Sequence, residues 1–270
     1  MIALRPRPTA VQGLLRLMAI LFLACLLPAS FALHERSSSA SSTRRLESLP
    51  QTILWAWERP EDLRFLPAGQ VGVSFLAATL TLSAGSVRVQ PRRNALQLTP
   101  GTPLVACARI EVDSKRSPTL SSHQASAASA AIGNLANLAG IGAVQVDFDA
   151  TVSERTFYAD LLRDLRRRLP PDMPLSITAL ASWCMDDTWI AGLPVDEAVP
   201  MLFRMGPDAA DVRVLLAQRR DFSLPVCRES IGISTDEKLA ALPAGRRRYV
   251  FGPEGWSPGA VRALIAEAKP

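Results

Sequence analysis

The chain has 270 residues, of which 48% are hydrophobic and 20% charged, so it can form a globular domain with a sizeable core. Three of its 30 basic residues lie within residues 1–32, which hold no acidic residue, and the remainder has 27 basic against 25 acidic residues. This balance gives no electrostatic basis for binding nucleic acid. With only two histidines, a His-rich metal centre is excluded, and we expect no metal.

Residues 1–32 have the layout of a secretory signal peptide. A positively charged start precedes an apolar run of 11 residues over 17–27, and Ser30-Phe31-Ala32 provides small residues for a cleavage site. The run is shorter than the roughly 20 apolar residues that span a bilayer. We therefore predict cleavage and a periplasmic or secreted protein. The alternatives are an uncleaved N-terminal anchor and, less favoured, a lipid anchor at Cys25, and only these would attach the protein to a membrane.

A Ser-rich segment over 33–48 comes after the leader. Six of the twelve residues over 34–45 are Ser or Thr, and such a composition buries too little apolar surface to offset the entropy of ordering. We predict a disordered linker here and a folded domain over 49–270.

Eight short strands are predicted in the folded domain, alternating with helices or loops. Several are nearly continuous apolar runs, which is typical of a sheet covered on both faces. The expected strands are 52–57, 71–82 (in two runs), 103–112, 143–149, 175–183, 198–205, 230–235 and 248–251. The expected helices are 121–138, 151–169, 207–219 and 257–268, of which the first two begin at capping boxes.

Strand–helix alternation predicts parallel pairing, and eight such units predict a compact (β/α)8 barrel of the TIM type. Some of its helices are expected to be short or missing, and the barrel forms a single α/β domain. A doubly wound open sheet is the alternative. That fold normally carries a phosphate loop or a dinucleotide fingerprint, whereas Gly140-Ile141-Gly142 lacks the third glycine and precedes a strand. We therefore expect no cofactor.

Side-chain alternation selects residues at the mouth of the predicted barrel, where the active sites of this fold lie. Along 143–149, Gln145, Asp147 and Asp149 share one side and alternate with apolar residues that must face the helices. Both aspartates are therefore expected to point into the lumen. We expect Asp147 to be structural, paired with Arg109 or Arg204, and Asp149 to be functional because it lies nearer the mouth.

Carboxylates at the mouth indicate hydrolysis of glycosidic bonds, which uses one carboxyl group as acid and a second as base or nucleophile. The candidate catalytic residues are Asp149, Glu111 and Asp236. Aromatic rings stack on sugars, with Trp57 and Trp183 the best candidates, although for any single tryptophan we favour a plug at an end of the barrel. The candidate substrate-binding residues are Trp57, Glu58, Arg109, Asp147, Trp183, Arg204, Glu237 and Trp256.

Three cysteines lie outside the leader. Cys107 sits in an apolar strand and is expected to be a buried, free residue. Cys184 and Cys227 lie beside predicted loops, and an oxidising compartment favours a disulfide between them.

Several sequence blocks resemble the bacterial domain-of-unknown-function 3142 family, and together they span about 52–256. These blocks are 55–63, 144–150, 153–158, 175–184, 193–206 and 232–237. The family has no assigned activity, so this resemblance implies no catalytic residues.

A looser similarity is to chitinase-like glycoside hydrolases, whose fourth barrel strand carries Asp-x-x-Asp-x-Asp-x-Glu with the Glu as acid. Asp147 and Asp149 match its Asp-x-Asp part, and Thr151 stands at the position of the Glu. The similarity thus implies that the acid of any such enzyme comes from elsewhere, for instance from Glu111, Asp236 or Glu237.

Two hypotheses are consistent with these residues. In the first, the protein is an exported hydrolase that acts on an oligosaccharide or a cell-envelope glycan with paired carboxylates. In the second, it is a catalytically silent barrel that binds such a glycan or a protein partner. Lumen carboxylates that are all neutralised by arginine would favour the second hypothesis.

Overall fold

The computed structural model describes residues 44–185, 187–239 and 241–267. The chain divides into two units, residues 1–44 and 45–270, and the second unit contains the folded domain. The predicted leader and most of the predicted linker lie outside the described residues.

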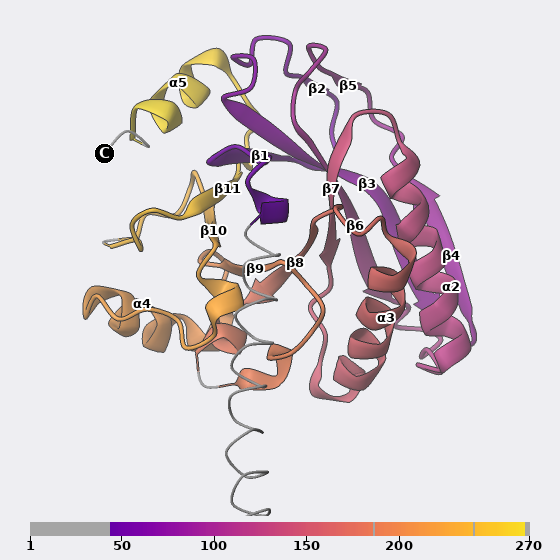
Figure 1. Cartoon of the computed structure of the whole chain (residues 1–270). Helices are drawn as coiled ribbons and strands as arrows, with labels where there is room; N and C mark the ends of the chain where they lie inside the picture. The colour runs from indigo at the N-terminus through magenta and orange to yellow at the C-terminus, as the bar shows by residue number, and fades with distance from the viewer. Residues whose placement is uncertain (1–43, 186, 240, 268–270) are drawn as a thin grey trace, which may run out of the picture. The chain divides into compact units, whose positions relative to one another are not determined.

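Eight parallel strands close into a barrel (Figure 1). Each strand pairs with the next along the chain, and β1 pairs with both β3 and β11, which closes the sheet. The strands are β1 (Thr52–Ala56), β3 (Val71–Ser83), β6 (Leu104–Val112), β7 (Ile141–Asp147), β8 (Leu175–Leu180), β9 (Glu197–Met201), β10 (Ser230–Ser234) and β11 (Arg247–Phe251). The predicted TIM-type barrel is confirmed, and all eight strands coincide with predicted runs.

Three further strands were not predicted. β4 (Ser86–Pro91) pairs antiparallel with the long β3, and β2 (Glu61–Asp62) and β5 (Leu96–Gln97) form a small parallel pair. β4 shows no apolar run because its residues are almost all exposed at the edge of the sheet. The two predicted runs over 71–82 are one strand, with a bulge between Leu76 and Ala78.

Four α-helices lie where the sequence predicts them, although some are shorter. They are α2 (Ser122–Gly133), α3 (Arg155–Arg168), α4 (Ala209–Ala217) and α5 (Pro258–Glu267). The capping box at Thr151 forms, because Glu154 reaches back to the Thr151 backbone amide at 2.7 Å. The one at Ser121 forms only in part: the Ser121 hydroxyl accepts a hydrogen bond from the backbone amide of Gln124 at 3.2 Å, but the Gln124 side-chain oxygen accepts from the Leu120 amide instead of that of Ser121. In the described parts of the connections after β1, β3, β8 and β10 there is no α-helix.

Three apolar cores hold the described part of the barrel together. The largest lies between the strands and the helices, where Val144, Val146 and Phe148 of the β7 region pack with the buried face of α3. The side-chain alternation predicted for this strand is therefore confirmed. A second core lies between α5 and the strands β1, β3 and β11. The third fills the lumen and includes Ile53 and Tyr249.

The segment before β1 plugs the N-terminal end of the barrel. Leu46 and Leu49 are buried in the lumen core, and the carbonyl of Leu46 accepts a hydrogen bond from the Arg247 guanidinium at 2.9 Å. Arg45 donates to Asp196 at 2.7 Å. The barrel unit thus begins at Arg45, a few residues before the expected boundary at 49.

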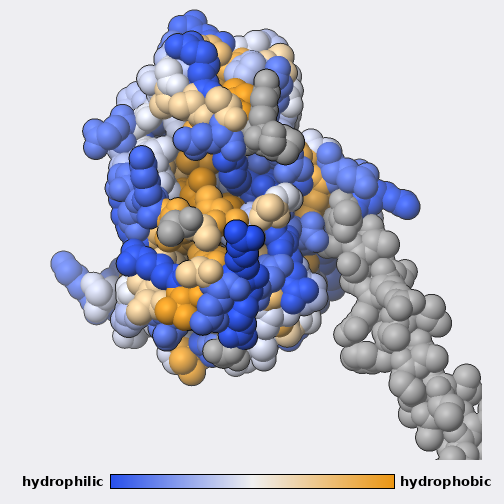
Figure 2. All heavy atoms as spheres, turned by 90° about the vertical axis from the view of Figure 1, so that its left-hand side faces the viewer, coloured by the Kyte–Doolittle hydropathy of each residue, from blue (hydrophilic) through white to orange (hydrophobic). Residues whose placement is uncertain are grey.

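The connection after β10 leaves part of the barrel's outer surface open. A hollow of about 460 Å³ lies there between α5 and residues 235–242, lined by Ile233, Val250 and Leu264 among others. Figure 2 shows this side of the molecule, where apolar side chains gather in a depression between the α5 and α4 ends. A helix after β10 would normally cover this surface.

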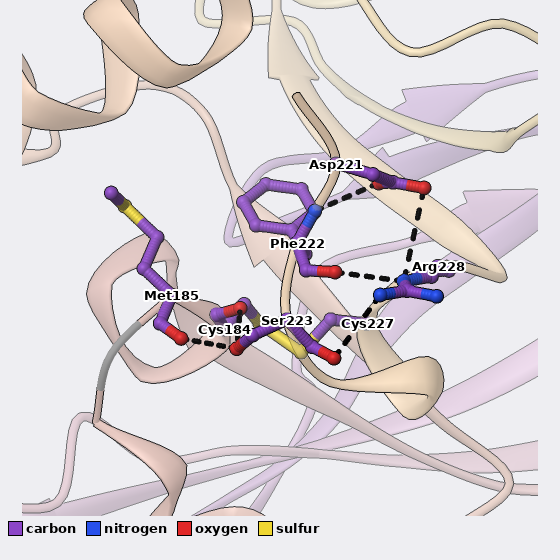
Figure 3. The surroundings of a disulfide bond; sticks show 7 residues. All are labelled: Cys184, Met185, Asp221, Phe222, Ser223, Cys227 and Arg228. Carbon is purple, nitrogen blue, oxygen red and sulfur yellow. Dashed lines mark hydrogen bonds and ion pairs between the residues drawn. A yellow bond between two sulfur atoms is a disulfide. The ribbon is translucent and has the colours of Figure 1, made fainter. Parts of the chain in front are cut away.

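The predicted disulfide is confirmed. Cys184 and Cys227 are bonded, and their Cα atoms lie 5.8 Å apart, within the roughly 4.4–6.8 Å usual for disulfides. Figure 3 shows the surroundings of the bond, which joins the 3-10 turn after β8 to the 3-10 turn before β10. The Ser223 backbone amide and hydroxyl hold the same two segments together, because both donate to the Cys184 carbonyl, each at 3.0 Å. Cys107 is buried and free, as expected.

None of the helices among the described residues has the length and the apolar composition that crossing a membrane requires.

Candidate functional site

A cavity of about 270 Å³ opens at the C-terminal ends of the barrel strands, where the sequence predicts a site. It is lined by Trp55, Trp57, Arg109, Asp147, Asp149, Thr178, Leu180, Met201, Phe203, Arg204 and Phe251. Five of the predicted site residues are among these: Trp57, Arg109, Asp147, Asp149 and Arg204.

A buried polar cluster in the lumen holds Trp55 at the cavity. Its indole N–H donates to the Gln145 side-chain oxygen at 2.9 Å, and the Ser74 hydroxyl donates to the same oxygen at 3.0 Å. The amide nitrogen of Gln145 donates to Ser176 at 3.0 Å. Gly232 lets the indole approach closely, because a Cβ there would lie 3.0 Å from the ring. The orientation of this ring is therefore fixed from several sides.

Two phenylalanines form an aromatic wall beside Trp55. The rings of Phe203 and Phe251 are stacked, with centroids 5.8 Å apart and planes inclined by 6°. The guanidinium of Arg204 lies 5.1 Å from the centre of the Phe251 ring. With Trp57, these side chains give the cavity four aromatic residues and only a few polar groups, which is typical of small-molecule sites.

Asp147 is fully engaged at the base of the cavity. Its two carboxylate oxygens bind the Arg109 guanidinium at 2.8 Å and the Thr178 hydroxyl at 2.7 Å, and the residue is only 4% exposed. Arg109 is one of the two partners expected for it. These contacts suit a structural role, which holds β6, β7 and β8 in register at their ends.

Asp149 differs from Asp147 in its surroundings. It is exposed at the rim, and among the described residues no hydrogen bond or ion pair engages it. Partial removal from water and the neighbouring Asp147 carboxylate raise the pKa of Asp149 above its ordinary value of 3.8, and Arg109 offsets part of this rise. Of the mouth carboxylates considered in the sequence, Asp149 alone lines the cavity without such a partner.

Glu111 and Asp236 are neutralised by arginines and do not line the cavity. Glu111 lies 3.1 Å from the Arg109 guanidinium, and Asp236 lies 3.2 Å from that of Arg204. The Ser234 hydroxyl, with a further contribution from Arg204, lowers the pKa of Asp236.

Arg204 is held in a strained backbone conformation, with φ of 49°. Its backbone N–H donates to the Glu237 carboxylate at 3.1 Å, while its side chain contacts Asp236 and the two phenylalanines. A non-glycine residue in this region costs about 1–3 kcal/mol and persists where the surroundings enforce it. Glu237 thus contributes by fixing Arg204 and not by lining the cavity.

The structure places three further predicted ligand contacts, besides Glu237, away from the cavity. Glu58 is exposed beyond β1. Trp183 is 2% exposed and packs edge-on against Trp189, with ring centres 4.9 Å apart, in the core between barrel and helices. β8 ends at Leu180 and a 3-10 turn comes next, so the alternation expected up to 183 stops there. Trp256 donates to the Trp55 carbonyl at 3.0 Å and packs on Gly252, so it supports β1.

Several lining residues were not selected from the sequence. The sequence identifies Phe203 and Phe251 only as apolar residues of predicted strands. In the structure Phe251 is the last residue of β11, and Phe203 lies just beyond the end of β9. Thr178 shares a face of β8 with Ser176, and Trp55 shares one with Trp57. This alternation is the signal that identifies Trp55 and Thr178.

The closed barrel with a cavity at its mouth defines a protein of the (β/α)8 class. Residues 100–202 match the family described as "Domain of unknown function (DUF3142)", which confirms the predicted resemblance over β6 to β9. A solved structure assigned as chitinase A from Streptomyces coelicolor superposes with a TM-score of 0.46. It is 12% identical, and the alignment covers 81% of this chain and 95% of that one. No curated protein matches the chain.

Within the described ranges, no group of three or more His, Cys, Asp or Glu side chains is arranged to hold a metal ion.

We expect Asp147→Asn to destabilise the protein and Asp149→Asn not to. Loss of the Asp147 charge leaves Arg109 with one partner fewer, and since Arg109 is partly exposed we expect a loss of about 2–3 kcal/mol, below the range for a fully buried pair. Urea denaturation at pH 7 measures both variants.

The charge of Asp149 has the opposite effect on stability. Because its pKa is raised in the folded state, that state binds a proton more tightly than the unfolded chain, and ionisation near pH 7 weakens folding. Asp149→Asn should therefore leave the unfolding free energy unchanged or slightly raised. A marked loss for Asp149→Asn with none for Asp147→Asn would reverse the two roles.

Proposed function

We propose that this barrel binds a glycan at its mouth, as an exported protein. The observation that carries the proposal is the cavity with four aromatic side chains, Trp55, Trp57, Phe203 and Phe251, among a few fixed polar groups. Apolar faces of sugar rings stack on such side chains, while carboxylates and guanidinium groups bind the hydroxyls. The volume of about 270 Å³ suits a small ligand or the end of a longer one.

Neutralisation of the mouth carboxylates supports binding over hydrolysis by a carboxylate pair. Asp147 and Glu111 bind Arg109, and Asp236 binds Arg204. A paired mechanism needs a second carboxyl group near the reacting bond. Glu111 and Asp236, the two candidates for a partner of Asp149, are engaged elsewhere.

Trp57→Ala should weaken glycan binding by about tenfold or more, because a stacked aromatic ring at a site centre is worth at least 1–2 kcal/mol. Trp57→Phe keeps an aromatic face and should lose much less. Calorimetric titration of the purified protein against a panel of neutral and charged oligosaccharides measures both. Equal affinity of Trp57→Ala and the unaltered protein for every bound glycan would contradict the proposal.

Hydrolysis with Asp149 as the acid is the second candidate, and the raised pKa of Asp149 favours it. Turnover of the same oligosaccharides, followed by mass spectrometry, tests it. Turnover lost in Asp149→Asn and kept in Glu111→Gln and Asp236→Asn would establish an Asp149-dependent hydrolase. Turnover that needs Glu111 or Asp236 would instead support hydrolysis by a pair of carboxylates.

Export is supported by the leader pattern over 1–32 and by the disulfide, which is typical of oxidising compartments. Cell fractionation with sequencing of the mature N-terminus tests it, and cytoplasmic protein that starts at Met1 would overturn it.

A further inference from the structure

Carboxylates predominate among the charged side chains that line the cavity or bind its two arginines. Two guanidinium groups, those of Arg109 and Arg204, line the cavity. The carboxylates that line it or bind these arginines are those of Asp147, Asp149, Glu111, Asp236 and Glu237. When all are ionised, these five carboxylates outnumber the two guanidinium groups, so this set of side chains favours a cation over an anion.

The two arginines do not reverse this field for an incoming ligand. Arg109 donates through Nε to Glu111 and through Nη1 to Asp147. Arg204 donates through Nη2 to Asp236. An anionic group that approached either guanidinium would also be repelled by the carboxylate already bound to it.

Asp149 is the group that a cation can reach. It lines the cavity, it is exposed, and no described residue forms a hydrogen bond or ion pair with it. The aromatic residues Trp55 and Trp57 line the same cavity, and the faces of such rings attract cations within about 6 Å. The Arg109 guanidinium already lies 5.9 Å from the centre of the Trp57 ring. An open carboxylate beside indole faces is a suitable site for an ammonium group.

We propose that the cavity takes an amino sugar whose amine is free and protonated, with the ammonium group bound to Asp149 and the sugar ring against the tryptophans. This rests on the proposed function and adds the chemical class of the ligand. The apolar faces hold the ring, and the carboxylate distinguishes a free amine from a hydroxyl or an acetylated amine.

The test compares three oligosaccharides of equal length at pH 7 and low salt: one of glucosamine, one of N-acetylglucosamine and one of glucose. Calorimetric titration of the full chain should give about tenfold higher affinity for the glucosamine oligomer than for either neutral one, which is the effect of one charged hydrogen bond. The difference should shrink in 0.5 M salt because the mouth is exposed.

Asp149→Asn should abolish the preference for glucosamine, so that the affinity for the glucosamine oligomer falls by about tenfold to that of the neutral oligomers. Asp211→Asn on the exposed side of α4 is the matched control, because it removes the same charge away from the cavity and should keep the preference. Loss of the preference in both variants would assign it to the net charge of the protein and overturn the role of Asp149.

Failure of this inference is distinguishable from failure of the proposed function. Neutral oligomers that bind as tightly as glucosamine would overturn the amine preference and leave glycan binding in place. No binding of any oligomer would overturn both. Cyclohexylamine that binds as tightly as the glucosamine oligomer would show that the sugar contributes nothing, and would overturn the assignment of an amino sugar.

Discussion

Replacing Glu197 by alanine is expected to lower the free energy of unfolding by about 3–5 kcal/mol, the cost of removing one partner from a buried ion pair. Glu197 is fully buried at the N-terminal end of the lumen. Its carboxylate lies 3.0 Å from the Arg247 guanidinium, and it accepts a hydrogen bond from the Tyr249 hydroxyl at 2.6 Å. The alanine variant leaves a guanidinium that is only 7% exposed without its counter-charge.

Urea denaturation followed by tryptophan fluorescence measures this loss as a shift of the midpoint. Glu197→Gln keeps the size of the side chain and an oxygen for Tyr249, so it should lose less. The double variant Glu197→Met with Arg247→Met removes both charges and should recover part of the loss. A change below about 1 kcal/mol in Glu197→Ala would contradict the role given to this pair, since that is the range of exposed pairs.

Removing the disulfide is expected to cost about 4 kcal/mol, because the bond closes a loop over a sequence separation of 43 residues and so restricts the unfolded chain. The variant is the double replacement Cys184→Ala with Cys227→Ala. Both side chains are buried, so part of the loss will come from packing. Thermal and urea unfolding in the absence of reductant compare it with the unaltered protein.

Cys107→Ala is the matched control, because it removes a buried cysteine that forms no disulfide. Cys107→Ala should lower the free energy of unfolding much less, and reductant should still lower the stability of this variant. The double variant should be insensitive to reductant. If the unaltered protein is equally stable with and without reductant, the disulfide contributes little to stability.

The fold could be predicted because each barrel strand is a local apolar run. Strands such as 143–147 are buried on both sides, and the helices that come after them begin at capping residues that can be read directly. β4 was not predicted because an exposed edge strand needs no apolar run. The alternation of side chains located Asp147 and Asp149 correctly for the same local reason.

The candidate site could be predicted only where the strands stay regular. Trp183 was expected at the mouth, but the chain turns at Ala181 and carries the ring to the other side of the strand layer. The partners of the carboxylates depend on contacts between distant segments. Glu111 is the exception, because its partner Arg109 lies two residues away on the same face of β6. Nothing near Asp236 in the sequence shows that Arg204 will neutralise it.

The plug formed by residues 45–50 places the start of the barrel unit at the end of the barrel opposite the cavity. Arg45 and Leu46 are bound at the N-terminal ends of β9 and β11, whereas the cavity lies at the opposite ends of the strands. Whatever precedes Arg45 therefore joins the barrel on the side away from the mouth. A ligand that enters the cavity therefore approaches the end of the barrel opposite the point where the preceding chain is attached.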